Sequence, residues 1–126
     1  MRALRYTTTW LSVGYTFVAA IVVLSLIPLP EGSTTISDKL QHLLVYLVLA
    51  LWFGAIYRQE RFARLGLGLI ALGVLIECLQ LGTGYRSFEL ADMLMDVLGT
   101  GAGLLLAATP AGGALLWVER WLPRRD

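Results

Sequence analysis

Ionisable side chains interrupt a chain that is otherwise strongly apolar, and they concentrate in two segments. One segment contains Asp38, Lys39 and His42, and the other runs from Glu77 to Asp96. A charge near the centre of a bilayer costs at least a few kcal/mol, so ionisable groups in apolar segments need a partner or a function. Carboxylates, an imidazole and a guanidinium can hold a metal ion, a shared proton or a phosphate. These residues are therefore the candidates for a functional site.

The spacing of these polar residues matches one side of a helix. Asp38, His42 and Tyr46 are each four residues apart, and Glu77 and Gln80 are three apart. Residues three or four apart are neighbours on a helix surface. A third series steps by four, three and four residues, through Asp92, Asp96, Gly99 and Gly103. Gly99-x-x-x-Gly103 also predicts close packing against a neighbouring helix.

Carboxylates outnumber cationic groups in these segments. The carboxylates are Asp38, Glu77, Glu89, Asp92 and Asp96, and the cations are Lys39 and Arg86. Crowded and poorly solvated carboxylates cannot all ionise cheaply. We therefore expect a shared proton or a bound divalent cation, whose identity stays open. The metal-ligand candidates are Glu77, Asp92, Asp96 and His42.

Arg86 stands just before a predicted helix start, which is a natural position for binding a phosphate or a carboxylate. The alternative is a simple ion pair with Glu89 or Asp92. An enzyme built on this site would use Asp92 or Glu77 as general base and Arg86 to hold the phosphate. Whether the protein is an enzyme stays open.

The composition indicates a membrane protein. The chain has 126 residues, of which 57% are hydrophobic and 15% charged, and its mean hydropathy is +0.70. A chain this short cannot hide so much apolar surface in water. The net charge of +1 argues against a nucleic-acid partner bound through bulk charge. We expect one domain over residues 1–126, with the lipid bilayer as its surroundings.

Four apolar runs are long enough to cross a bilayer as helices. Their predicted ranges are 10–29, 38–57, 65–81 and 88–109, followed by an interfacial helical tail over 110–126. The first run is longer than the apolar region of a signal peptide, so we expect it to be retained. The prediction is an all-α integral membrane four-helix bundle with short loops.

The arginine and lysine residues predict the orientation of this bundle. Eight of them lie in the N-terminus, the 58–64 loop and the tail, whereas the other two loops and their helix starts hold only Lys39 and Arg86. Positive loops stay cytoplasmic, so both termini are predicted in the cytoplasm and the loops 31–37 and 82–88 outside. With a rise of ~1.5 Å per residue, His42, Glu77 and Asp96 then lie roughly 6–10 Å inside the outer helix ends.

Three motifs in this order resemble the VanZ-like family of small membrane proteins: S-D-K-L-Q-H-L-L-V-Y, E-C-L-Q and G-Y-R-S-F-E-L-A-D-M-L-M-D-V-L-G-T-G-A-G. The resemblance covers roughly residues 36–107. One departure is Asp96, which stands where asparagine is usual in the family. The matching positions are Asp38, Lys39, His42, Tyr46, Glu77, Gln80, Arg86, Ser87, Asp92, Gly99 and Gly103.

The resemblance implies a four-helix bundle in the cytoplasmic membrane of a bacterium and a link to the cell envelope. The founding member of the family is associated with resistance to the glycopeptide teicoplanin. We take Asp38, His42, Glu77, Arg86 and Asp92 as the central site residues. The supporting residues are Lys39, Tyr46, Gln80, Ser87, Gly99 and Gly103.

Three classes of function remain open at the level of the sequence. The first is a protein that binds or modifies an envelope lipid or its phosphate headgroup from the outer leaflet, with a lipid-linked envelope precursor as its partner. The second is a structural or interaction protein whose polar cluster only locks the bundle. The third is a small proton-coupled carrier, which would need oligomers or a partner to form a path.

Overall fold

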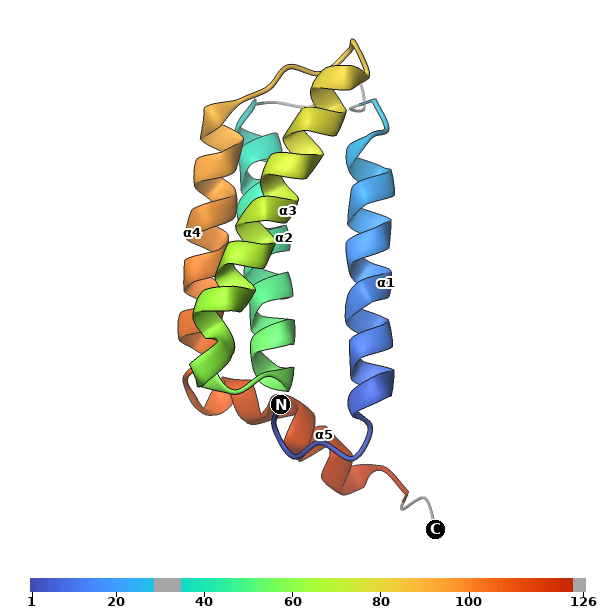
Figure 1. Ribbon diagram of the computed structural model, residues 1–126, viewed down its shortest axis with the longest axis vertical. Helices are drawn as coiled ribbons and strands as arrows, with labels where there is room; N and C mark the ends of the chain where they lie inside the picture. The colour runs from blue at the N-terminus through green and yellow to red at the C-terminus, as the bar shows by residue number, and fades with distance from the viewer. Residues whose placement is uncertain (29–34, 124–126) are drawn as a thin grey trace.

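Helices account for most of the computed structural model, which describes residues 1–28 and 35–123, without the side chains of Thr35 and Ser37. Helices α1 to α4 stand along the bundle, and α5 lies across one of its ends (Figure 1). The described part of the chain contains no strand, which confirms the predicted all-α fold. The elements are α1 (Thr7–Ser25), α2 (Thr35–Ile56), η1 (Gln59–Arg61), α3 (Phe62–Gly82), α4 (Leu90–Ala107), η2 (Pro110–Gly113) and α5 (Ala114–Trp121).

The four long helices are long and apolar enough to cross a membrane. Large aliphatic side chains point away from the bundle: Leu67 is 69% exposed, Leu90 74% and Leu105 73%. Such a continuous apolar surface is unfavourable in water and matches lipid acyl chains. The chain is therefore a multi-pass membrane protein.

The helix ends differ from the predicted ranges by a few residues. Helices α2 and α3 begin before their apolar runs, at Thr35 and Phe62. A helix can extend past its apolar run, because its polar turns still satisfy their backbone hydrogen bonds. Helix α4 is shorter than predicted because Glu89 has an extended backbone and Thr109 leads into η2. The predicted loop 31–37 lies mostly outside the described residues.

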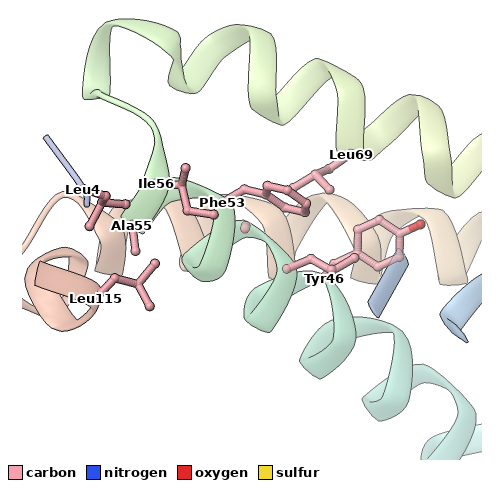
Figure 2. Close-up of a cluster of buried hydrophobic side chains, with 9 residues drawn as sticks. Leu4, Tyr46, Phe53, Ala55, Ile56, Leu69 and Leu115 are labelled. Carbon is pink, nitrogen blue, oxygen red and sulfur yellow. The ribbon is translucent and has the colours of Figure 1, made fainter. Parts of the chain in front are cut away.

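Helix α2 is the centre of the bundle and contacts α1, α3, α4 and α5. Its Leu49, Ala50, Phe53 and Ile56 are buried in the hydrophobic core. Figure 2 shows Phe53 facing Leu69 of α3, with further apolar side chains gathered towards α5. Most of the core therefore lies in the half of the bundle nearer to α5, and Tyr46 extends it towards the half that holds the polar side chains.

Helix α4 packs directly against the backbone of α2. A Cβ atom on Gly99 would collide with the carbonyl oxygen of Leu43, and one on Gly103 would lie 2.7 Å from the Cβ of Ala50. Only glycine allows this approach at both positions. The contact is the packing that the Gly99-x-x-x-Gly103 spacing predicts.

Helix α1 is less closely packed than the others. Gly14 is its only buried residue, and a Cβ atom there would lie 2.8 Å from the ring of Phe53. The indole of Trp52 also donates a hydrogen bond to the carbonyl of Trp10, at 3.1 Å. Cavities lie between α1, α2 and α3 towards each end of the bundle.

Glu119 of α5 joins the two ends of the chain. Its carboxylate accepts hydrogen bonds from the backbone N–H groups of Arg5 (2.7 Å) and Tyr6 (2.9 Å) and from the indole of Trp10 (2.7 Å). Burial tends to raise the pKa of Glu119, but these hydrogen bonds to the carboxylate outweigh it and lower the pKa. The N-terminal segment and α5 thus lie at the same end of the bundle, as four crossings require (Figure 1).

Candidate functional site

The predicted site residues converge at the end of the bundle opposite α5, where α1 and α3 end and α2 and α4 begin (Figure 1). Helix α2 directs Lys39 and His42 towards α4, and the turn after α3 brings Arg86 to Asp38. We refer to this group as the polar cluster. Its members are Asp38, Lys39, His42, Glu77, Arg86, Glu89, Asp92 and Asp96.

Lys39 connects α2 to the start of α4. Its Nζ lies 2.7 Å from Oε2 of Glu89 and 3.1 Å from Oδ1 of Asp92. The hydrogen bond from Lys39 lowers the pKa of Glu89 below its usual range. Lys39 therefore pairs with the two carboxylates that sequence analysis offered as partners of Arg86.

His42 is held between two carboxylates of α4. Its Nδ1 lies 2.8 Å from Oδ1 of Asp96, and its Nε2 lies 3.9 Å from Oδ2 of Asp92. A carboxylate on Nδ1 fixes the orientation of an imidazole and leaves Nε2 for a ligand or a proton. Since His42 also lines a cavity, it is the member of the polar cluster best placed for chemistry.

Glu77 is fully buried and occupies a capping position. Its Oε2 accepts the backbone N–H of Glu89 at 3.1 Å, at the N-terminus of α4. Its Oε1 has no hydrogen-bond partner in the described part of the chain. Glu77 does not line the cavity that His42 lines. The contact supports a role in joining α3 to α4, and a catalytic role for Glu77 stays a prediction.

Two further buried polar atoms have no hydrogen-bond partner among the described residues: Oδ2 of Asp96 and the hydroxyl of Tyr46. Both lie over Gly73 of α3, where a Cβ atom would be 2.5 Å from Oδ2 and 3.2 Å from the hydroxyl. Gly73 thus makes room for them, a role that sequence analysis missed. A single glycine inside an apolar helix is only a weak signal. Sequence analysis also missed Thr100, whose buried hydroxyl likewise finds no partner within residues 1–28 and 35–123.

Arg86 contacts Asp38 rather than Glu89 or Asp92. Its Nη2 lies 3.3 and 3.4 Å from the two carboxylate oxygens of Asp38. Strong charge-assisted hydrogen bonds are shorter, about 2.7–2.9 Å. The pair is therefore loose, and it leaves other N–H donors of the guanidinium for a ligand.

The supporting residues hold neighbouring elements in place. The amide of Gln80 donates to the carbonyl of Ser25 at 2.9 Å and so joins α3 to the end of α1. The hydroxyl of Ser87 lies 3.4 Å from Oε1 of Glu89. These contacts position the segments that surround Arg86.

A cavity of about 460 Å³ opens beside the polar cluster, between α1, α2 and α3. Its polar side carries Asp38, His42 and Arg86, and Gln80 lies at its α3 wall. The remaining lining is largely apolar and includes Ile21, Leu24, Ile27, Val45 and Ile76. We call this space the polar-end cavity.

Asp38, His42 and Asp92 could hold a metal ion, since one ligand atom from each lies within 4.8 Å of the others. Two carboxylates and an imidazole suit several divalent cations, and Asp96 on Nδ1 would support the imidazole ligand. However, Asp38 already contacts Arg86 and Asp92 already contacts Lys39. A bound cation would therefore share or replace these contacts. The other predicted ligands, Glu77 and Asp96, lie outside this group.

The comparisons with known proteins agree with the motifs. A model of the VanZ/LLP1 family matches residues 4–111, which include the whole polar cluster. Searches of curated proteins and of solved structures found no match. Since the family match covers most of the chain, this membrane protein belongs to the VanZ/LLP1 family.

Proposed function

We propose that this protein binds the phosphate-bearing headgroup of a cell-envelope lipid in the polar-end cavity. The carrying observation is the lining of that cavity, which joins an aliphatic wall from α1 to Arg86 and His42. An amphipathic space with a few convergent polar groups is typical of a ligand site. A lipid headgroup matches the polar residues, and the start of its acyl chain matches the aliphatic wall.

Arg86 supplies the main attraction for the phosphate. Its contact with Asp38 is long, so a phosphate can replace Asp38 as the partner of the guanidinium and accept shorter, bidentate hydrogen bonds from it. The nearby carboxylates oppose an anion, and a divalent cation on Asp38, His42 and Asp92 would offset that repulsion. The proposal therefore predicts tighter binding when a divalent cation is present.

A catalytic version of this function would use His42. The imidazole is oriented by Asp96 and lines the cavity, so its Nε2 is positioned to accept or donate a proton near the headgroup. Asp92, whose Oδ2 lies 3.9 Å from Nε2, would stabilise the protonated imidazole. Binding alone does not require this step.

The family and the charge distribution support a biological setting for this function. We propose that the protein lies in the cytoplasmic membrane of a bacterium, with the polar-end cavity on the extracytoplasmic side. Binding an envelope lipid there would influence the susceptibility of the host to teicoplanin. The arginine-rich loops at the other end support this orientation.

The test compares Arg86→Gln and Arg86→Lys with the control Arg58→Gln. Arg58 makes an exposed ion pair with Glu60 and does not line either cavity between α1, α2 and α3. Each protein is purified in phosphatidylcholine nanodiscs, and binding of phosphatidic acid, a phosphomonoester lipid, is measured with and without chelator. We expect Arg86→Gln to weaken binding about tenfold, because a hydrogen bond to a charged group contributes about 1.5–3 kcal/mol. Arg86→Lys should lose less, and Arg58→Gln should not change binding.

The competing function is a structural lock, and the inter-helix contacts of the polar cluster favour it. Lys39 and His42 join α2 to α4, and Glu77 joins α3 to α4. If Arg86→Gln binds phosphatidic acid as the unmodified protein does, while its folded yield falls, the lock is the better explanation. Teicoplanin susceptibility of cells expressing each variant, compared at equal folded yield, tests the envelope role separately.

A further inference from the structure

A second cavity of about 410 Å³ lies between α1, α2 and α3 in the half of the bundle where α3 begins. None of its lining residues belongs to the polar-end cavity. Its walls are mainly apolar, whereas Arg61 and Arg64 lie at the start of α3. We call it the arginine-end cavity.

The two arginines are available for an anionic ligand. Both are exposed, and within residues 1–28 and 35–123 no carboxylate forms a salt bridge with either of them. Their neighbour Arg58 differs, because it pairs with Glu60 at 3.1 Å. Helix α3 also starts at Phe62 without a side-chain cap, so its positive end adds to the same region.

The apolar wall continues from the arginines along α3. Leu65, Leu69 and Leu72 are spaced by four and three residues and line the cavity from one face of the helix. Phe53 lies opposite Leu69 (Figure 2). Gly68 also lines this space, and a Cβ atom on it would have no neighbour within 4 Å. The side chains thus leave an open slot along α3, which continues from the two arginines and passes the exposed Gly68.

We propose that the arginine-end cavity binds an anionic phospholipid. The phosphodiester group lies against Arg61 and Arg64, and one acyl chain enters the slot beside Gly68. The order of charge and apolar surface along α3 matches the order of headgroup and chain in a lipid. Neutral zwitterionic lipids offer no net negative charge to the arginines and bind more weakly.

The experiment uses full-length protein, with phosphatidylglycerol as the probe and phosphatidylcholine as the neutral comparison. Native mass spectrometry counts the lipids retained as each is titrated. One variant combines Arg61→Gln with Arg64→Gln, and Arg58→Gln is its control. A second variant, Gly68→Leu, fills the slot, and Gly101→Leu is its control because Gly101 on α4 has equally open space.

We expect the double arginine variant to lower the affinity for phosphatidylglycerol about tenfold or more. Gly68→Leu should lower it as well, because the leucine occupies the path of the chain. Both controls should bind as the unmodified protein does, and phosphatidylcholine binding should be weak throughout. Unchanged binding by the double arginine variant would overturn the proposal. So would normal binding by Gly68→Leu, since the lipid would then be adsorbed on the surface only. The two cavities share no lining residue, so the same titration repeated in an Arg86→Gln background separates lipid held at the arginine-end cavity from lipid held at the polar-end cavity.

Discussion

At the scale of single residues, the buried carboxylate of Asp96 is only partly hydrogen-bonded. Its Oδ1 contacts His42 at 2.8 Å, but Oδ2 is buried without a partner among the described residues, next to the unpaired hydroxyl of Tyr46. A buried polar atom without a partner costs about 1–3 kcal/mol. An asparagine at this position would place an amide donor beside the tyrosine.

We therefore predict that Asp96→Asn raises the free energy of unfolding by about 1 kcal/mol, because the amide donates to Tyr46 while its oxygen still accepts from His42. Asp96→Ala should lower it, since the contact with His42 is lost. Thermal unfolding in detergent, followed by circular dichroism, measures the two changes. Equal destabilisation by both variants would show that the negative charge of Asp96, rather than its hydrogen-bonding geometry, stabilises His42.

At the scale of elements, the contact between α2 and α4 controls the site. These helices carry His42 and its two carboxylates, so their separation sets the distances of 2.8 and 3.9 Å. Gly99 and Gly103 allow that short separation because they have no Cβ atom, and a Cβ atom at either position would overlap the backbone of α2. Packing of small residues thus determines the geometry of the polar residues one to three turns away.

Gly99→Ala is expected to lower the free energy of unfolding by roughly 1–3 kcal/mol, because the added methyl group overpacks α4 against the backbone of α2. Gly101→Ala is the matched control on the same helix, since its Cβ meets no atom within 4 Å. It should be neutral or stabilising by about 0.5–1 kcal/mol. Thermal unfolding compares the two. A control that is as unstable as Gly99→Ala would point to glycine flexibility in α4 instead of close packing.

At the scale of the whole molecule, the two ends of the bundle differ in charge. The polar cluster has more carboxylates than cations, whereas the end with α5 and η1 carries the arginines of the N-terminus, of residues 58–64 and of α5. Glu119 joins the N-terminal segment to α5 at this arginine-rich end. This separation supports a single orientation in the membrane.

We predict that the arginine-rich end faces the cytoplasm. In a Cys78→Ser background, which removes the exposed native thiol, Thr83→Cys should react with a membrane-impermeant thiol reagent on intact cells. Gln59→Cys should react only after the membrane is permeabilised. The reverse labelling pattern would move the polar cluster to the cytoplasmic leaflet and exclude an extracytoplasmic headgroup as its ligand.

The sequence by itself determined the helices and most members of the polar cluster. Lipid offers no hydrogen bonds to the backbone, so an apolar run of sufficient length must form a helix. Spacing by three and four residues then showed that Asp38 and His42 share a helix face, and that Asp92 and Asp96 share another. The family motifs agreed with these positions, and the match over residues 4–111 confirmed the family.

Only the tertiary structure decided which groups meet. The pairing of Arg86 with Asp38, of Lys39 with Asp92, and the capping contact of Glu77 depend on the rotation and relative depth of the helices. Spacing within one helix does not specify either quantity, because both result from the packing of several helices at once. The two cavities arise in the same way, because α1 packs closely at Gly14 and more loosely towards its two ends.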